Sequence, residues 1–289
     1  MSGDHSGCLL CHSVSGVGHM SAKDQTTEPE TVITVRNLRT QFGAQVIHDN
    51  LDLDVHRGEV LGVVGGSGTG KSVLLREIIG LLRPAAGDVC LFGAQLWNLD
   101  RAARLPILRR CGVLFQDGAL FSSMTVAENI ELPIRERGGV SLQLAQDVAR
   151  INLQMVGLPA NAADKYPSEL SGGMRKRAGL ARALALDPDI VFLDEPTAGL
   201  DPISAADFDQ LIKDLQQALG LTVFMVTHDL DSLHAICDRI AVLVDQKITT
   251  GTIAQVQAVG HPWIEDYFNG PRGRAANSGA SDADYSGQG

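Results

Sequence analysis

The chain has 289 residues, of which 44% are hydrophobic and 20% charged, an ordinary globular composition. Its 34 acidic and 24 basic residues give a net charge of −10, which argues against binding nucleic acid through a basic surface. No run of about eighteen apolar residues is present, so we expect no segment to span a bilayer. The five cysteines, an odd number, fit a reducing compartment better than a disulfide framework.

Residues 1–30 are rich in Ser, Gly, His, Asp and Glu without an apolar period, which predicts a disordered extension. Met20 is an alternative start of the chain. Within this segment Cys8, Cys11 and His12 match the C-x-x-C-H pattern of haem attachment. No export signal precedes the pattern, and no second ligand pair follows at zinc-finger spacing. We therefore favour a chance occurrence over haem or a metal site.

From residue 31 onward, short apolar segments alternate with longer amphipathic ones. Gly, Pro and polar turns bound the apolar segments, a pattern typical of buried strands. Alternating buried strands and helices predict an α/β fold with a mainly parallel sheet, preceded by short antiparallel strands. We expect strands at residues 32–35, 51–55, 59–64, 89–93, 111–115, 190–193, 221–226 and 240–244.

The region from residue 117 to about 185 is expected to be mainly helical and inserted into the sequence of the sheet. Residues 142–156 carry apolar side chains on one helical face, and Gly157 follows as a helix stop. A second amphipathic helix covers residues 208–219 and is closed by Gly220.

These patterns predict one domain over residues 31–270, with the helical region inside it. Residues 271–289 are polar, small and glycine-rich, and we expect a disordered tail there.

A glycine-rich segment, G-G-S-G-T-G-K-S, lies between an apolar strand and an apolar helix that we expect to begin at Ser72. The glycines let backbone N–H groups surround a phosphate, and the helix start adds its positive end. Lys71 supplies a charge for the β- and γ-phosphates, and the Ser72 hydroxyl is a ligand for Mg²⁺. The alternative is a glycine-rich turn that binds nothing. We predict a nucleoside triphosphate site made by Gly65, Gly66, Ser67, Gly68, Thr69, Gly70, Lys71 and Ser72.

Two acidic residues follow the strand at 190–193. In an open α/β sheet, Asp194 then emerges at the edge where ligands bind. We expect Asp194 to hold Mg²⁺ through water and Glu195 to act as the general base on the attacking water. The alternative for two adjacent acids is a solvated turn.

The segment Leu-Ser-Gly-Gly-Met at 170–174 precedes a basic helical run, residues 175–177. Ser171 is a good helix N-cap, and the two glycines leave backbone N–H groups unobstructed. The segment fits either a second anion site or a simple helix start. Ser171 lies 23 residues before Asp194, and this position favours the anion site.

Taken in order, the phosphate loop, Gln116, the Ser-Gly-Gly segment, the acid pair, residues 198–201 and His228 resemble the ATP-binding subunit of ABC transporters, over roughly residues 32–250. The resemblance implies an ABC-type P-loop nucleotide-binding domain. Such a domain has a RecA-like core with a mainly parallel sheet, an N-terminal antiparallel β-subdomain and an inserted α-helical subdomain.

The resemblance also implies roles for the remaining site residues. Phe42 would stack on adenine, Gln116 would touch Mg²⁺ and the attacking water, and His228 would contact the γ-phosphate. Ser171, Gly172 and Gly173 would form the signature that closes on the γ-phosphate of the opposite subunit, and Asp201 would belong to the D-loop. The implied ligands are ATP and Mg²⁺, with Ser72, Gln116 and Asp194 around the metal.

Local strings narrow the resemblance. Residues 112–121, 166–174 and 261–270 resemble the ATPases of Mla (maintenance of lipid asymmetry) phospholipid transporters. Met174 replaces the usual Gln of the signature, which removes a side-chain hydrogen bond but leaves the serine and glycines in place.

The resemblance implies an ATP-hydrolysing motor at the cytoplasmic face of an inner membrane, attached through a separate permease. Two copies would enclose two ATP molecules, with a periplasmic lipid-binding protein and a small STAS-domain protein as further partners.

One alternative is an ABC ATPase for another solute. Another is a non-transport ABC protein acting on ribosomes or DNA, but those usually carry two cassettes or a long coiled-coil insertion, and we expect no nucleic-acid partner.

Overall fold

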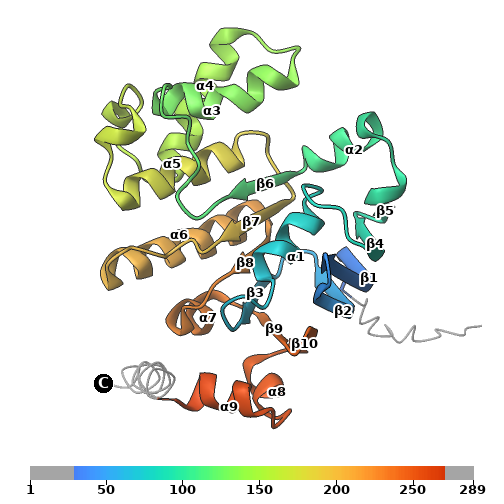
Figure 1. The fold of residues 1–289 in the computed structure, drawn as a ribbon. Helices are drawn as coiled ribbons and strands as arrows, with labels where there is room; N and C mark the ends of the chain where they lie inside the picture. Colours follow the sequence, from blue (N-terminus) through green and yellow to red (C-terminus); the bar gives the residue numbers. More distant parts are fainter. Residues whose placement is uncertain (1–28, 271–289) are drawn as a thin grey trace, which may run out of the picture.

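The computed structural model describes residues 29–270, which form an α/β structure with two β-sheets (Figure 1). The cysteine pattern near the N-terminus, Met20 and the tail at 271–289 lie outside the described residues. In the described part, no helix is both long enough and apolar enough to cross a membrane.

The larger sheet has six strands in the order β10-β9-β3-β8-β7-β6. All neighbouring strands run parallel except the edge pair β9 and β10. The mainly parallel sheet expected from the sequence is therefore confirmed. Its strands are β3 (Val60–Gly65), β6 (Cys111–Leu114), β7 (Ile190–Asp194), β8 (Thr222–Val226), β9 (Arg239–Val244) and β10 (Lys247–Gly251).

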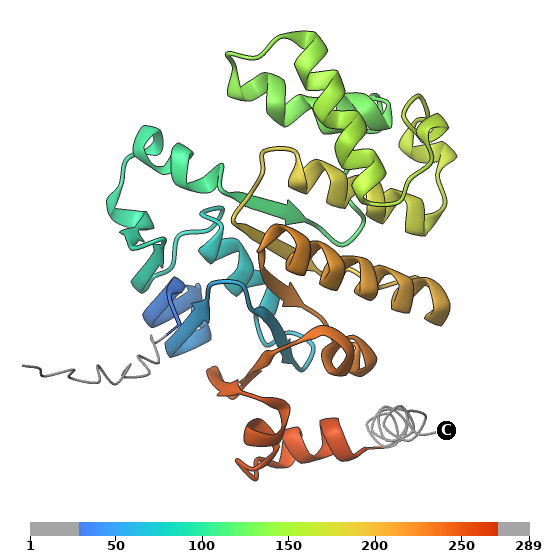
Figure 2. The ribbon, with the colours of Figure 1, turned by 180° about the vertical axis from the view of Figure 1, so that it is seen from behind.

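The central strands β3, β7 and β8 are buried along their whole length. Successive side chains of a strand point to opposite faces, so both faces of the sheet are covered there. Phe192 and Phe224, with ring centroids 5.5 Å apart, join the core beneath α1 (Lys71–Ile78). Leu193 and Met225 join the core on the other face, beneath α6 (Pro202–Leu219). Figure 2 shows α6 lying across that second face.

The smaller sheet is antiparallel, with the order β2-β1-β4-β5. Its strands are longer than the sequence pattern predicted, since β1 and β2 carry polar residues on the outer face. The strand expected at residues 89–93 belongs to this sheet rather than to the parallel one, and it ends before Phe92, whose φ is 52°. The bounds are β1 (Thr31–Phe42), β2 (Gln45–His56), β4 (Ala86–Leu91) and β5 (Ala94–Gln95).

The segment between β6 and β7 is helical and lies above the sheet in Figure 1. It contains α3 (Val126–Arg137), α4 (Leu142–Met155), α5 (Gly172–Leu184) and the 3-10 turns at Ala160–Ala162 and Pro167–Glu169. Helix α5 contacts α3, α4 and strand β6. It therefore joins the helical insert to the sheet.

The remaining helices connect or follow the strands. Helix α6 ends at Gly220, which has φ 65°, as the sequence predicted. Strand β10 and the two helices after it were not expected. Their bounds, with those of the other connecting helices, are the 3-10 turn Leu96–Asn98, α2 (Arg101–Leu108), α7 (Leu230–Ile236), α8 (Ile253–Gln257) and α9 (Pro262–Asn269).

Candidate nucleotide-binding site

Four predicted site segments follow parallel strands of the larger sheet. The phosphate loop, residues 65–72, follows β3, and Gln116 comes two residues after β6. Asp194 ends β7, and His228 comes two residues after β8. Because β3, β8, β7 and β6 are neighbours and parallel, their carboxyl ends meet at one edge of the sheet. Open α/β sheets bind their ligands at this edge.

Lys71 lies on the phosphate loop itself. Its Nζ donates to the carbonyl oxygens of Gly65 at 2.8 Å and Gly66 at 3.0 Å. Burial lowers the pKa of Lys71, while the nearby carboxylates of Glu195 and Asp194 act in the opposite direction. The loop therefore holds a partly desolvated ammonium group against backbone carbonyl oxygens. An anion that binds to the loop can take the place of these carbonyls as the partner of the ammonium group.

Gly70 has to be a glycine for two reasons. Its φ is 98°, and a Cβ there would overlap the side chains of Ile47 and His48 on β2. This close approach fixes where helix α1 begins. The first N–H groups of a helix have no intrahelical partner, so the start of α1 is suited to a phosphate.

Ser72, in the first turn of α1, lies close to Asp194 at the end of β7. Ser72 Oγ donates to Asp194 Oδ1 at 3.2 Å. Burial raises the pKa of Asp194, against the lowering effect of the Ser72 hydrogen bond. Hydroxyl and carboxylate oxygens are the ligand types that Mg²⁺ accepts, together with phosphate and water oxygens. The pair therefore fits the predicted metal position.

Glu195 and His228 form the second pair at this edge. His228 Nδ1 donates to Glu195 Oε2 at 2.7 Å. The backbone of Glu195 is in the left-handed region with φ 52°, and its N–H donates to the carbonyl oxygen of Val226 at 2.8 Å. A non-glycine residue pays a conformational cost there, so the surrounding contacts hold this carboxylate in a defined place.

Phe42 and Gln116 are the two outer members of the predicted site. Phe42 ends β1 and is 48% exposed, so its ring is available for stacking. Gln116 lies in the glutamine loop, residues 115–121, and its carbonyl oxygen accepts a 2.8 Å hydrogen bond from Lys176 Nζ. Lys176 also donates to the carbonyl oxygen of Glu195 at 3.1 Å. The sequence marked Lys176 only as part of a basic run.

The signature segment, residues 171–173, is built as a helix start. Ser171 Oγ accepts a hydrogen bond from the N–H of Met174 at 3.2 Å, which confirms the predicted N-cap of α5. Leu200 of the D-loop, residues 198–201, lies next to both glycines. Among the described residues, the hydrogen bonds of this segment reach none of the phosphate-loop residues.

Asp201 ends the D-loop as the N-cap of α6. It accepts from the N–H of Ser204 at 3.0 Å and from the Ser204 hydroxyl at 2.6 Å. These hydrogen bonds lower the pKa of Asp201. The carboxylate is thereby tied to its own helix start.

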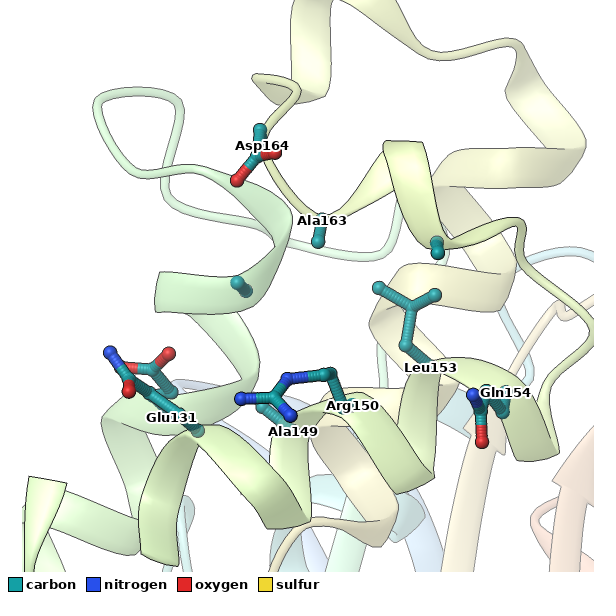
Figure 3. A pocket seen from close by; sticks show the side chains of 10 residues that line it. Glu131, Ala149, Arg150, Leu153, Gln154, Ala163 and Asp164 are labelled. Atoms are coloured by element: carbon teal, nitrogen blue, oxygen red, sulfur yellow. The ribbon is translucent and has the colours of Figure 1, made fainter. Parts of the chain in front are cut away.

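A separate pocket of about 400 Å³ lies in the helical insert between α3, α4 and the turn after α4 (Figure 3). Glu131 and Arg150 line it, and burial raises the pKa of Glu131. None of the predicted site residues lines this pocket.

Comparison with known protein families gives one assignment. The family described as "ABC transporter" matches residues 48–198, slightly more than half of the chain. The chain belongs to the ABC transporter family.

Curated members of the family extend the match. The intermembrane phospholipid transport system ATP-binding protein MlaF of Haemophilus influenzae is 42% identical over 78% of this chain and 86% of its own length. MlaF of Escherichia coli is 38% identical over 83% and 89%. A probable ribonucleotide transport ATP-binding protein of Mycobacterium leprae is 39% identical over 83% and 69%. The resemblance to Mla ATPases is thus confirmed.

Solved structures agree with the assignment. The dimeric ATP-binding cassette MJ0796, in a post-hydrolysis state with ADP and Pi, is 32% identical, with a TM-score of 0.70 over 76% of this chain and 98% of that one. CbiO1 from Clostridium perfringens is 25% identical, with a TM-score of 0.72 over 87% and 99%. The chain is therefore an ATP-hydrolysing ABC subunit with the expected fold.

Proposed function

We propose that this ABC subunit drives phospholipid transport as the ATPase of a transporter of the Mla type. Its similarity to two MlaF proteins over most of both chains supports the cargo. The observation that supports the motor role is the convergence of the phosphate loop, the Ser72–Asp194 pair and the Glu195–His228 pair at one edge of the sheet.

ATP binds with its phosphates on residues 65–72 and its adenine against the exposed ring of Phe42. The Lys71 ammonium leaves the carbonyls of Gly65 and Gly66 and pairs with the β- and γ-phosphates, a stronger charge-assisted contact. Ser72, Asp194 and Gln116 are the residues that would hold Mg²⁺. When bound, this ion neutralises charge on the phosphate oxygens.

Glu195 orients and deprotonates the attacking water as the general base. His228 fixes the Glu195 carboxylate through the 2.7 Å hydrogen bond and has a largely exposed side chain. It is therefore placed to contact the γ-phosphate as well. Val226 and Lys176 hold the Glu195 backbone, so the carboxylate does not have to be ordered during the reaction.

A second copy of the chain completes each ATP site. Ser171, Gly172 and Gly173 begin an α-helix and carry helix-start N–H groups, yet they bond to no phosphate-loop residue of their own chain within the described residues. We assign them to the γ-phosphate held by the opposite copy, with Asp201 and the D-loop beside them.

A permease docks in a groove of about 480 Å³ beside the glutamine loop. The groove lies between that loop, α3 and the end of α5, and Phe121 at its rim is 51% exposed. A largely apolar groove with few charges suits a short amphipathic helix. Docking there places the ATPase at the cytoplasmic face of the inner membrane, with periplasmic lipid-binding and STAS-domain proteins as partners of the same complex.

The M. leprae relative supports a second candidate, in which the cargo is another solute such as a ribonucleotide. The two candidates are separated by purifying the complete complex in detergent, identifying the bound cargo by mass spectrometry and measuring ATPase activity in liposomes. We expect stoichiometric phospholipid, and hydrolysis that depends on the permease. A complex without bound phospholipid whose ATPase responds to ribonucleotides would overturn the lipid assignment.

A further inference from the structure

In the described part of the chain, Lys176 is the one residue of the basic run 175–177 that hydrogen-bonds to Glu195, at the sheet edge where the predicted site residues meet. It lies on the second turn of α5 and is only 5% exposed. Its Nζ donates to the carbonyl oxygens of Gln116 and Glu195, at 2.8 Å and 3.1 Å. One buried ammonium group thus joins the signature helix, the glutamine loop and the loop of the general base.

Burying an ammonium group is costly unless its hydrogen bonds are replaced. Burial lowers the pKa of Lys176, while the carboxylates of Asp117 and Glu195 favour its charged form. The cost is offset only while both carbonyl oxygens stay in reach. The lysine therefore favours one relative position of the two loops.

The same face of α5 holds the glutamine loop at two further points. A Cβ at Gly179 would lie 2.7 Å from Leu114 Cδ1 and 2.9 Å from Gly118 Cα, so helix and loop pack too closely for any side chain. Arg182 donates to the carbonyl oxygens of Gly118 and Ala119, at 2.8 Å and 2.7 Å. Positions 176, 179 and 182 are spaced by three residues and share one helix face. Helix α5 and the glutamine loop are thus expected to move together.

Of the hydrogen bonds that the described residues make at these three positions, only one from Lys176 reaches Glu195. We propose that Lys176 is a positioning residue that links the backbone of Glu195 to the glutamine loop and the signature helix, so that ATP cleavage responds to movements of α5. The inference rests on the proposed function, in which the permease docks beside the glutamine loop and a second copy docks on the start of α5.

The test uses the full transporter complex and the isolated subunit, each carrying Lys176→Met, which keeps the chain length but removes the donors. We expect the kcat of the complex to fall about ten- to a hundredfold, the loss typical of charge-assisted hydrogen bonds. The Kd for ATP of the isolated subunit should change less than about twofold. Stimulation by the permease is the kcat of the complex divided by the kcat of the isolated subunit. In this variant the ratio should approach one. Lys176→Arg should restore most of the stimulation, because it keeps the donors.

Arg177→Met is the matched control. Arg177 is the next residue on α5 and donates to the carbonyl oxygen of Val156, away from the loops. It should lower the Tm while leaving stimulation by the permease unchanged. If Lys176→Met does not fold, Lys176→Gln, with a shorter donor, decides the matter, and its stimulation should be reduced.

The proposal is overturned if Lys176 variants keep the wild-type stimulation, or if Arg177→Met abolishes it equally. It is also overturned if ATP affinity and kcat fall together, which would indicate a general structural role. Failure of the proposed function looks different, because the wild-type complex itself would then show no permease-dependent hydrolysis.

Discussion

The phosphate loop and the signature segment are both helix starts suited to phosphate, but they are built differently. The phosphate loop is surrounded by its own chain: Lys71 bonds to its carbonyls, and Ser72 bonds to Asp194 across the sheet edge. Within the described residues, the hydrogen bonds of the signature segment belong to its own helix start: Ser171 Oγ accepts from the N–H of Met174, and the Ser171 carbonyl oxygen accepts from the N–H of Arg175. The Leu200 side chain lies nearby. We propose that the first is a preformed half of a site, and that the second receives its phosphate from a second copy of the chain.

We therefore expect changes in the two halves to affect different steps, ATP binding in one case and ATP cleavage in the other. Changes in the phosphate-loop half should act on the affinity of a single chain for ATP. Changes in the signature half should act on the assembled dimer, and changes in Glu195 on cleavage alone.

The largest effect is expected for Glu195→Gln. Loss of the general base should lower hydrolysis by roughly 10²- to 10⁴-fold, while ATP binding is retained and the ATP-bound dimer accumulates. Steady-state turnover and size-exclusion chromatography with ATP check this. Glu128→Gln, at the capping box of α3, is the control and should turn over normally. Near-normal turnover of Glu195→Gln would remove this residue from the catalytic role.

Lys71→Ala should have the next largest effect. The bound triphosphate loses its fixed cation, so the Kd for ATP should rise about ten- to a hundredfold. Calorimetry on the isolated subunit measures this, with the exposed Lys247→Ala on β10 as the control. An unchanged affinity would contradict the assignment of the phosphate loop.

A smaller effect, on stability, is expected at Asp209, a buried carboxylate on α6. Its Oδ2 accepts from Ser232 at 2.6 Å, and the Ser232 hydroxyl lies 3.5 Å from that of Thr197, between Glu195 and the D-loop. Burial raises the pKa of Asp209 from 3.8 to about 6. The folded state then binds the proton more tightly than the unfolded state, so this residue reduces stability as the pH rises from about 4 to about 6.

Asp209→Asn removes this ionisation. The variant should be more stable than the wild type by roughly 3 kcal/mol at pH 7.5, and the two should converge near pH 4. Denaturant unfolding of the isolated subunit at the two pH values measures the difference. Asp207→Asn, at an exposed position of the same helix, is the control. A variant that is equally destabilised at both pH values would show that the charge is not the cause.

The parts predicted from sequence are those whose chemistry is local. The phosphate loop is contiguous, the N-cap of α5 needs only Ser171 and the residues after it, and apolar runs identify the buried strands. Parallel strands then place Gln116, Asp194 and His228 at one edge without further information.

The parts that sequence did not predict depend on distant partners. Lys176 bonds to residues 60 and 19 positions away, and nothing in a basic run indicates which lysine is buried. The strand around residue 90 reads as a buried strand, but its pairing with β1 is set by tertiary packing. Residues 247–251, which carry lysine and three polar or small residues, gave no apolar signal for β10.

The composite site is tested most directly by mixing two defective chains in the transporter complex. Ser171→Arg blocks the signature half, and Lys71→Ala blocks the phosphate-loop half. In a heterodimer, one ATP site then carries both defects and the other carries neither. We expect each mutant homodimer to be inactive, and the mixed dimers to recover nucleotide trapping and hydrolysis. A signature that acts within its own chain leaves no intact site, so the absence of both trapping and hydrolysis on mixing, or full activity of Ser171→Arg alone, would contradict the account.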